Sequence, residues 1–319
     1  MGMQRYLIRR LLLSVPTLLG VSLIVFTVIR LAPGDVIDLI VGDYGAASPE
    51  VKEAIRKEYS LDDNMLVQYG SWLSDIVRFD LGRSIISNRT VASELGNRLP
   101  VTFQLSLMAI LFSTTFGLTI GVISAIRQDT AVDYVGRSVA VGLLAVPGFW
   151  VAILLITLAG RYFAWGVPPN RYVPFTENPI GNIKMLIIPA LILGIALSGS
   201  VMRFTRSAML EVLRQDYIRT ASAKGLRSRT VMVRHALRNA LIPVVTVIGL
   251  QLPVLVGGTV IIESIYSIPG MGQYYITAVN SHDYPIIQGF NLLVAAVVVF
   301  ANLLIDVMYS LLDPRIRYA

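Results

Sequence analysis

Side chains capable of catalysis or metal binding are few in this sequence. It contains no cysteine, which excludes disulfides, iron–sulfur clusters and thiolate zinc sites. Its two histidines, His235 and His282, stand far apart in the chain, and neither has a second histidine at metal-ligand spacing, so we expect no metal site. Asp306 lies inside a long apolar run, where a carboxylate is either functional or bonded to a neighbouring helix.

Sequence motifs for nucleotide chemistry and hydrolysis are also absent. No G-x-x-x-x-G-K-[ST] phosphate loop occurs, and no glycine-rich dinucleotide fingerprint follows a strand. The sequence contains no H-E-x-x-H zinc motif, no G-x-S-x-G elbow and no S-x-x-K pair. We therefore expect that the chain by itself is not an enzyme, has no catalytic residues and binds no cofactor.

One polar stretch, residues 217–243, stands between strongly hydrophobic runs, and the segment 203–238 holds nine Lys or Arg residues against two acidic ones. Within it, residues 219–225 place small side chains between the long cations Arg219 and Lys224 and end at Gly225. Glycine adopts a positive φ readily, which permits a sharp turn there. Because basic loops of membrane proteins face the cytoplasm, this helix could dock a cytoplasmic partner along its small face. An ordinary basic loop that only sets membrane orientation is the alternative. The expected contact residues are Arg219, Thr220, Ala221, Ser222, Ala223, Lys224 and Gly225.

The elements that must position this stretch are membrane-spanning helices. The chain has 319 residues, 55% hydrophobic and 15% charged, with a mean hydropathy of +0.66. A soluble protein would not sustain several separate apolar runs of about 20 residues. The net charge of +7 is concentrated in loops expected to be cytoplasmic, so membrane orientation explains it better than nucleic acid binding does. Six spans are predicted, at 11–29, 103–126, 138–163, 185–201, 241–262 and 286–312.

Two features modify this bundle of spans. Pro147-Gly148 predicts a kink in the third span, because proline removes a backbone donor.

Residues 35–100 are a polar insert after the first span, which we expect outside the cytoplasm. Ser48-Pro49 is typical of a helix start, and apolar stripes follow over 51–59 and 66–77. The insert is either a platform for a substrate-binding protein or a stabilising lid.

The segment Arg219–Gly225 is similar to the cytoplasmic coupling loop of binding-protein-dependent ABC importer permeases. Their motif has an EAA triplet, three residues and a glycine, followed later by a hydrophobic-proline pair, here Ile242-Pro243. Arginine replaces the acidic first residue, and the gap from glycine to proline is long. Both departures resemble the dipeptide, oligopeptide and nickel branch. Further resemblances to that branch, which extend over essentially the whole chain, occur at 30–35, 80–84, 147–150, 263–272 and 313–317.

The resemblance implies an all-α polytopic membrane protein with six transmembrane helices, of the type I ABC importer permease architecture, with an extracytoplasmic helical insert after the first helix. It would be the first, B-type permease of its system. The implied domains are an N-terminal segment with the first helix at 1–30, the insert at 31–100, a core at 101–312 with the coupling loop at 203–240, and a cytoplasmic tail at 313–319.

The implied function is import of di- or oligopeptides by alternating access across the cytoplasmic (inner) membrane, with both termini in the cytoplasm. The implied partners are a second homologous permease, two cytoplasmic ATPase subunits that bind ATP and Mg, an extracytoplasmic substrate-binding protein and membrane lipid. Nickel chelates, glutathione or another small solute are alternative cargoes. A membrane-embedded enzyme lacks its catalytic residues here, and a passive channel would not need a docking motif.

The charge distribution predicts the topology directly. Single cysteines at Ser48, Asn178 and Ser281 should react with a membrane-impermeant thiol reagent in intact cells, because these loops are expected outside. A cysteine at Ser228 should react only after lysis, because it lies in the basic loop. Labelling of position 228 from outside would overturn the six-span topology.

Overall fold

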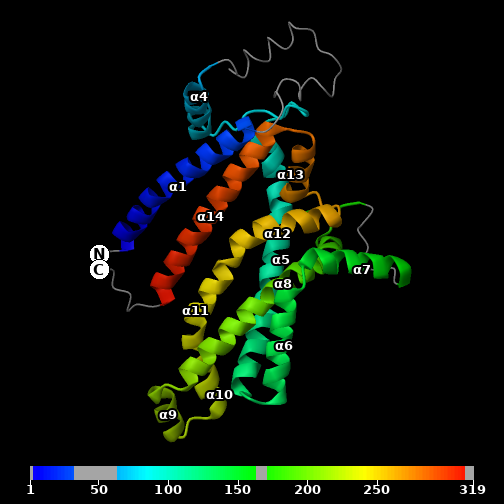
Figure 1. The fold of residues 1–319 in the computed structure, drawn as a ribbon. Coiled ribbons are helices and arrows are strands. Elements are labelled where there is room, and N and C mark those ends of the chain that lie inside the picture. Colours follow the sequence, from blue (N-terminus) through cyan, green and yellow to red (C-terminus); the bar gives the residue numbers. More distant parts are fainter. Residues whose placement is uncertain (1–2, 32–62, 163–170, 313–319) are drawn as a thin grey trace.

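Figure 1 shows the computed structural model of the chain, which describes residues 3–31, 63–162 and 171–312. These residues form helices joined by short connections, and strand-like pairing among them is limited to an isolated bridge between Arg83 and Thr90. The all-α prediction is therefore confirmed. The expected helix start at Ser48-Pro49, the stripe over 51–59 and the motif at 313–317 lie outside the described residues. In chain order the helices are α1 (Met3–Leu31), α4 (Met65–Val77), α5 (Val91–Ile126), α6 (Ala131–Ala145), α7 (Gly148–Tyr162), α8 (Pro179–Leu213), α9 (Asp216–Ala223), α10 (Ser228–Thr230), the π-helix η1 (Val231–Leu237), α11 (Arg238–Gly249), α12 (Gln251–Ile265), α13 (Met271–Asn280) and α14 (Tyr284–Leu312).

The helices agree with the six predicted spans in number and order. Five described stretches are long and apolar enough to cross a membrane, and α6 with α7 makes a sixth if the two are one broken span. The first and last spans, α1 and α14, run side by side in Figure 1. The five stretches are Ile8–Val28, Val91–Ile126, Pro179–Leu213, Ser228–Leu255 and Tyr284–Ile305.

The third span departs further from a straight helix than the predicted kink. Its two halves, α6 and α7, meet at 90°, so that α7 projects away from the other spans in Figure 1. The residue before the proline, Val146, has φ −90° and ψ 121°, an extended conformation that proline imposes on its predecessor. Since Pro147 also lacks an N–H group, the helix ends completely and restarts at Gly148.

The fifth span is divided as well, and a buried amide stands at the division. α11 ends at Gly249 and α12 begins at Gln251, whose side chain is 4% exposed. The Gln251 Oε1 atom accepts a hydrogen bond from Ser113 Oγ of α5 at 3.0 Å, and its Nε2 atom donates to the Leu197 carbonyl of α8 at 3.2 Å. A polar group at this depth must be satisfied inside the protein, so these bonds tie three spans together.

Close backbone contact between α5 and α8 forms the centre of the bundle. A Cβ atom added at Gly194 would lie 2.6 Å from the Ala109 carbonyl oxygen, and one at Gly121 would lie 2.7 Å from the Met202 carbonyl oxygen. Helices in membranes associate through such small residues, because lipid supplies no hydrophobic drive between them. The glycines of α5 and α8 therefore determine how closely the two helices pack.

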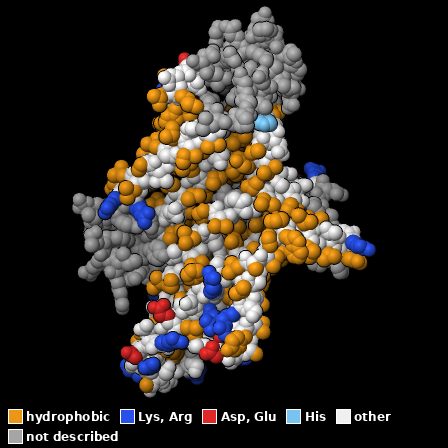
Figure 2. Space-filling view, in the orientation of Figure 1, with side chains coloured by type: hydrophobic (Ala, Val, Ile, Leu, Met, Phe, Trp, Pro, Cys, Tyr) orange, Lys and Arg blue, Asp and Glu red, His pale blue; other side chains and the backbone are white. Residues whose placement is uncertain are grey.

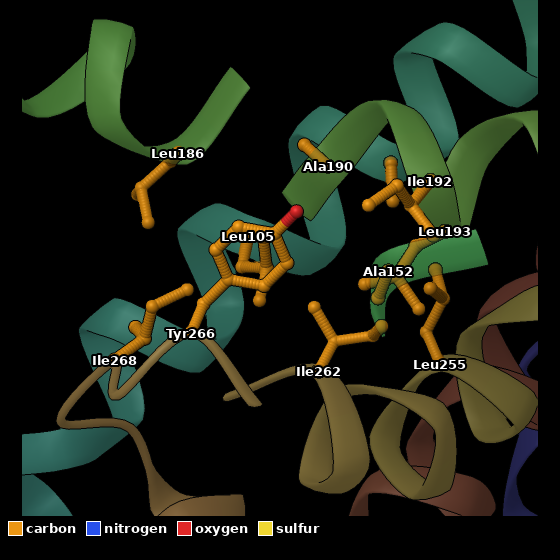
Figure 3. Packing of buried hydrophobic residues seen from close by; sticks show 11 residues of the cluster. Leu105, Ala152, Leu186, Ala190, Ile192, Leu193, Leu255, Ile262, Tyr266 and Ile268 are labelled. Carbon is orange, nitrogen blue, oxygen red and sulfur yellow. The ribbon is translucent and has the colours of Figure 1, made fainter. Parts of the chain in front are cut away.

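A cluster of buried apolar residues surrounds Tyr266 beside this contact (Figure 3). Residues of α5, α7, α8 and α12 contribute to it, including Leu105, Leu186 and Ile262. The Tyr266 hydroxyl points toward Ala190 in Figure 3 and, among the described residues, has no hydrogen-bond partner. A buried hydroxyl without a partner is destabilising. The stabilisation that Tyr266 gives the cluster therefore comes from burial of its aromatic ring.

The described part of the insert is anchored to the first span. The predicted stripe over 66–77 forms the helix α4. The Tyr69 hydroxyl and Ser22 Oγ are hydrogen-bonded at 2.8 Å, and the rings of Tyr69 and Trp72 lie 5.4 and 5.5 Å from that of Phe26. This aromatic contact fixes α4 beside α1.

The close approach of α5 and α8 gives a matched test. Gly194→Ala should lower the stability of the purified protein by about 1–3 kcal/mol, because the methyl group meets backbone that cannot move independently. Gly160→Ala in α7 is the control, because its added Cβ meets no atom within 4 Å. The melting temperatures of the two variants are compared, and that of Gly194→Ala should be the lower. Equal melting temperatures would contradict the packing described for α5 and α8.

Candidate functional site

The helix expected over 219–225 is present as α9, and it ends as its sequence predicts. Gly225 follows the C-cap Lys224 with a φ of +77°. The Gly225 N–H donates to the Ser222 carbonyl at 3.0 Å, and the Leu226 N–H donates to the Ala221 carbonyl at 3.4 Å. These two bonds form a Schellman motif, in which glycine satisfies the helix end without steric strain. The chain turns sharply at this point toward α10.

One face of α9 is packed into its own chain. Ile218 is 5% exposed and Ala221 is 9% exposed, and both belong to an apolar cluster with residues of α8, η1 and α11. The small face proposed for a partner is therefore partly internal: Ala221 supports the helix from beneath. The other expected contact residues are all exposed, namely Arg219, Thr220, Ser222, Ala223, Lys224 and Gly225.

The segment after α9 packs against the same buried face of that helix. Val231–Leu237 is a π-helix, a conformation frequent at functional sites, and Val231 and Ala236 join the same apolar cluster. The Asn239 Nδ2 atom donates to the Tyr217 hydroxyl at 3.2 Å and to the His235 carbonyl at 2.7 Å. His235 thus contributes its backbone carbonyl to the support of α9. In the described residues no group of three or more acidic or histidine side chains could hold a metal ion.

A buried ion pair joins this region to the turn between α5 and α6. The side chain of Asp133 is fully buried. Arg206 of α8 donates to it in bidentate geometry, from Nε to Oδ1 at 2.6 Å and from Nη2 to Oδ2 at 2.7 Å. Ser124 Oγ donates to Oδ1 at 2.5 Å, and the Asp129 N–H donates to Oδ2 at 3.0 Å. The carboxylate therefore locks three helices to one another.

The position of Arg206 connects this lock to α9. Arg206 lies on α8 before that helix ends at Leu213, and α9 begins at Asp216. Figure 1 shows the turn between α5 and α6 at the same end of the bundle as α9. A force applied to α9 therefore reaches α8 directly and the other two helices through Asp133. Asp133 lies between the predicted second and third spans, and its role could not be predicted because an acid beside several arginines does not reveal which one it contacts.

A second buried carboxylate organises the opposite end of the bundle. Glu263, the first residue after the predicted fifth span, belongs to the last turn of α12 and is fully buried. Its Oε2 atom accepts the N–H groups of Gly272 and Gln273 at 2.7 and 3.0 Å, and its Oε1 atom accepts Thr102 Oγ1 at 2.7 Å. Glu263 thus caps the positive N-terminal end of α13 and joins α5, α12 and α13.

The glycines of the same motif make this cap possible. A Cβ atom at Gly270 would lie 2.4 Å from the Glu263 Cδ atom, and one at Gly272 would lie 2.5 Å from the Val260 Cα atom. The first N–H group of α13, that of Met271, donates to Thr102 Oγ1 at 2.8 Å. The motif at 263–272 therefore encodes a helix–turn–helix junction whose first three N–H groups are all satisfied.

The motif at 80–84 is fixed to the connection before α14. Ser84 Oγ donates to Asp283 Oδ2 at 2.5 Å, and the Ile85 N–H donates to Asp283 Oδ1 at 3.2 Å. Nearby, the guanidinium of Arg98 stacks 3.7 Å above the ring of Tyr274. Burial, followed by the charge of a neighbouring carboxylate, raises the pKa of the Tyr274 phenol, so the ring stays neutral. These contacts connect the insert to α13 and α14.

The described residues thus form a polytopic helical bundle, with α9 and its basic flanking segment at one end and the buried junction at Glu263 at the other (Figure 1). Residues 117–318 match the family of binding-protein-dependent transport system inner membrane components, and residues 3–106 match the N-terminal family of the same membrane components. The chain belongs to this family. Its members are membrane permeases of ABC importers, which do not act as enzymes by themselves, so ATPase and substrate-binding components accompany it.

Several curated proteins are similar over the whole chain. A putative peptide transport system permease protein of Brucella abortus (strain 2308) is 41% identical over 316 residues, which cover 99% of this chain and 100% of the relative. The oligopeptide transport system permease protein of Bacillus subtilis (strain 168) is 38% identical and the dipeptide transport system permease protein of Alkalihalophilus pseudofirmus is 37% identical, each over 99% of this chain and 100% of the relative. A solved structure of an amino acid ABC transporter has a TM-score of 0.49 and 14% identity, over 70% of this chain and 95% of that one.

The ion pair at Asp133 predicts a specific pattern of stability. Arg206→Met should destabilise the protein by on the order of 3 kcal/mol, because it leaves a buried carboxylate without compensation. The double variant Asp133→Leu, Arg206→Met should recover most of this loss, because it removes the uncompensated charge. Thermal unfolding of the purified protein in detergent measures both. A double variant as unstable as Arg206→Met would show that charge compensation is not the reason.

Proposed function

We propose that this chain is one of two pore-forming permease subunits of an ATP-driven importer of di- or oligopeptides. Membership of the binding-protein-dependent family supports the importer, and the printed names of relatives similar over the full chain support the peptide cargo. The observation that carries the proposal is α9, a short helix in a basic segment, which is packed against its own chain on one face, exposed on the other and followed by a glycine with positive φ.

The proposed role of α9 is contact with a cytoplasmic ATPase subunit. Its outward residues are Arg219, Thr220, Ser222, Ala223, Lys224 and Gly225, while Ala221 holds the helix against the permease. ATP and Mg would bind to the ATPase subunits, whose closure would push α9. α9 follows α8 directly in the chain, and α8 is bonded to α5 and α6 through Asp133. The push would therefore tilt these spans together. That movement is the basis of alternating access.

The proposed orientation places α9 and both termini in the cytoplasm and α4 and α13 on the outer side of the cytoplasmic membrane. The excess of basic residues around α9 supports this orientation. On the outer side, the proposed partner is a substrate-binding protein that delivers cargo to the junction of the insert with α13. A second homologous permease would complete the path between the two subunits.

Selection of cargo in such a system would rest mainly with the binding protein. The described helices carry serine, threonine and glycine, and their buried carboxylates Glu94, Asp133 and Glu263 are each bound by an arginine or by backbone N–H groups. A path without fixed charges suits peptides of varied side chains.

The proposed role of α9 predicts a separation between assembly and coupling. Ala223→Trp and Gly225→Val should abolish uptake of a labelled dipeptide and transport-stimulated ATP hydrolysis at normal protein abundance, because they alter the outer face of α9 and the positive-φ turn that follows it. Lys224→Ala should be mild, since an exposed charge contributes little. Ala221→Trp should instead reduce abundance, because its side chain is internal.

Uptake and ATP hydrolysis of the reconstituted transporter measure this pattern, with protein abundance as the control. Normal transport by Ala223→Trp and Gly225→Val in an intact complex would contradict the docking role. Uptake of a nickel chelate by the unaltered transporter, without any uptake of peptide, would contradict the proposed cargo but not the importer.

A further inference from the structure

The helix α4 lies beside the part of α1 that is expected inside the membrane. The apolar stretch of α1 extends over Ile8–Val28. The Tyr69 hydroxyl of α4 and Ser22 Oγ are hydrogen-bonded at 2.8 Å, and the same hydroxyl donates to the Leu19 carbonyl at 3.4 Å. Ser22 precedes Val28 by six residues, which is about 9 Å along a helix at 1.5 Å per residue. α4 therefore contacts α1 within its apolar stretch, at a depth where the other faces of α4 meet lipid or protein.

The sequence of α4 provides a second apolar face besides the one that Tyr69 presents to α1. Leu66, Leu73 and Val77 are spaced at i, i+7 and i+11, so they form one stripe along the helix, the outward stripe of α4. Leu66 is 78% exposed and Val77 is 72% exposed. Asp75 lies on the opposite side of the helix and is exposed as well. An apolar stripe opposite a polar one is typical of a helix that lies in a membrane interface.

Phe79 follows α4 with a backbone conformation that is rare for its residue type, a φ of 63°. The Asp80 N–H donates to the Asp75 carbonyl at 2.9 Å, and the Phe79 N–H donates to the Ile76 carbonyl at 2.9 Å. Phe79 thus occupies the position that glycine usually takes in a Schellman motif, and it bears a steric cost that glycine would avoid. Its side chain is 91% exposed, so packing against the described residues does not offset that cost. An outlier of this kind points to a function of the ring outside its own chain.

Lipid is the partner that the position of α4 favours. Ile24 and Val28, near the end of the apolar stretch of α1, are 63% and 61% exposed, so this part of α1 faces acyl chains. Figure 2 shows hydrophobic side chains over α1 and α4 in the same view. Tyr69 and Trp72 are of the two residue types that are enriched at membrane–water interfaces. A soluble protein would approach from the water side, whereas the bond to Ser22 holds α4 beside the bilayer. The outward stripe of α4 therefore continues the lipid-facing surface of α1.

We propose that α4 is an interfacial membrane helix, with its outward stripe and the ring of Phe79 in the acyl-chain region of the leaflet where α1 ends. The partner is the lipid surface as a whole and not a single bound lipid. Transfer of the ring from water into lipid is favourable, and this offsets the left-handed backbone conformation of Phe79. In the proposed importer this anchor would hold the insert at a fixed height for the substrate-binding protein. That consequence rests on the proposed function, whereas the lipid contact itself does not.

The test is the depth of single spin labels in the full chain, reconstituted with cysteine-free accompanying subunits in vesicles of phosphatidylethanolamine and phosphatidylglycerol. Because the chain contains no cysteine, Leu66→Cys, Val77→Cys and Asp75→Cys each carry a single nitroxide. Oxygen concentrates among acyl chains and chromium oxalate in water, so power saturation of the nitroxide by the two reagents reports its depth. We expect the ratio of oxygen to chromium oxalate accessibility to be several-fold higher at positions 66 and 77 than at position 75, the matched control on the polar side.

Two results would overturn the proposal. A ratio at positions 66 and 77 as low as that at position 75 would place the outward stripe in water. Low accessibility of positions 66 and 77 to both reagents would show that protein covers the stripe, whether residues 32–62 of this chain, a second permease or a substrate-binding protein. Peptide uptake by the same vesicles is measured in parallel, so that failure of the lipid contact and failure of the proposed function are distinguished.

A second comparison tests the ring of Phe79 separately, with the spin label kept at position 77. Phe79→Gly removes the ring but suits the left-handed turn, so the variant should fold and should lower the oxygen preference at position 77. Phe79→Trp retains an interfacial ring and should leave that preference unchanged. An oxygen preference at position 77 that is the same in Phe79→Gly as in the unaltered chain would overturn the anchoring role of the ring.

Discussion

The buried carboxylate of Asp133 is the constraint on which the region around α9 depends. It can be ionised away from water only because Arg206, Ser124 and the Asp129 N–H group all donate to it. Each donor comes from a different part of the bundle, so the charge is stable only when α5, α6 and α8 are correctly placed. Burying this charge costs desolvation free energy, and only one arrangement of the three helices compensates that cost. It makes the end of the bundle beside α9 a single mechanical unit.

The same logic governs the rest of the membrane region. N–H and carbonyl groups that lose their helical partners where a helix breaks must be hydrogen-bonded inside the protein. The described spans break twice, at Pro147 between α6 and α7 and at Leu250 between α11 and α12. Gln251 bonds to α5 and α8 at the division of the fifth span, and Glu263 caps α13 where the chain leaves α12. Glycines allow the backbones to approach closely enough for these bonds. Polar side chains thus hold the spans in register, while apolar area supplies the bulk of the packing.

Periodicity and charge predicted the helices of this chain well, because long apolar runs in a basic framework allow few alternatives. Gly225 was predictable because glycine adopts the left-handed conformation of a helix end without the steric cost that other residues bear. The contacts of Asp133 with Arg206 and of Glu263 with Thr102 were not predictable, because 73 and 161 residues separate the partners in the sequence. The 90° corner at Pro147 was underestimated as a kink, because sequence shows a break but not its angle. The inward position of Ala221 required knowing what packs beneath α9.

The central claim is that α9, α8 and the turn between α5 and α6 move as one body. Spin labels at Ser222 of α9 and Gln128 of that turn, and at Ser222 and Ile8 of α1, can be compared by double electron–electron resonance in the complete transporter. We predict that the first distance stays constant between nucleotide-free and ATP-trapped states, while the second changes. A change in the first distance as large as that in the second would contradict the account.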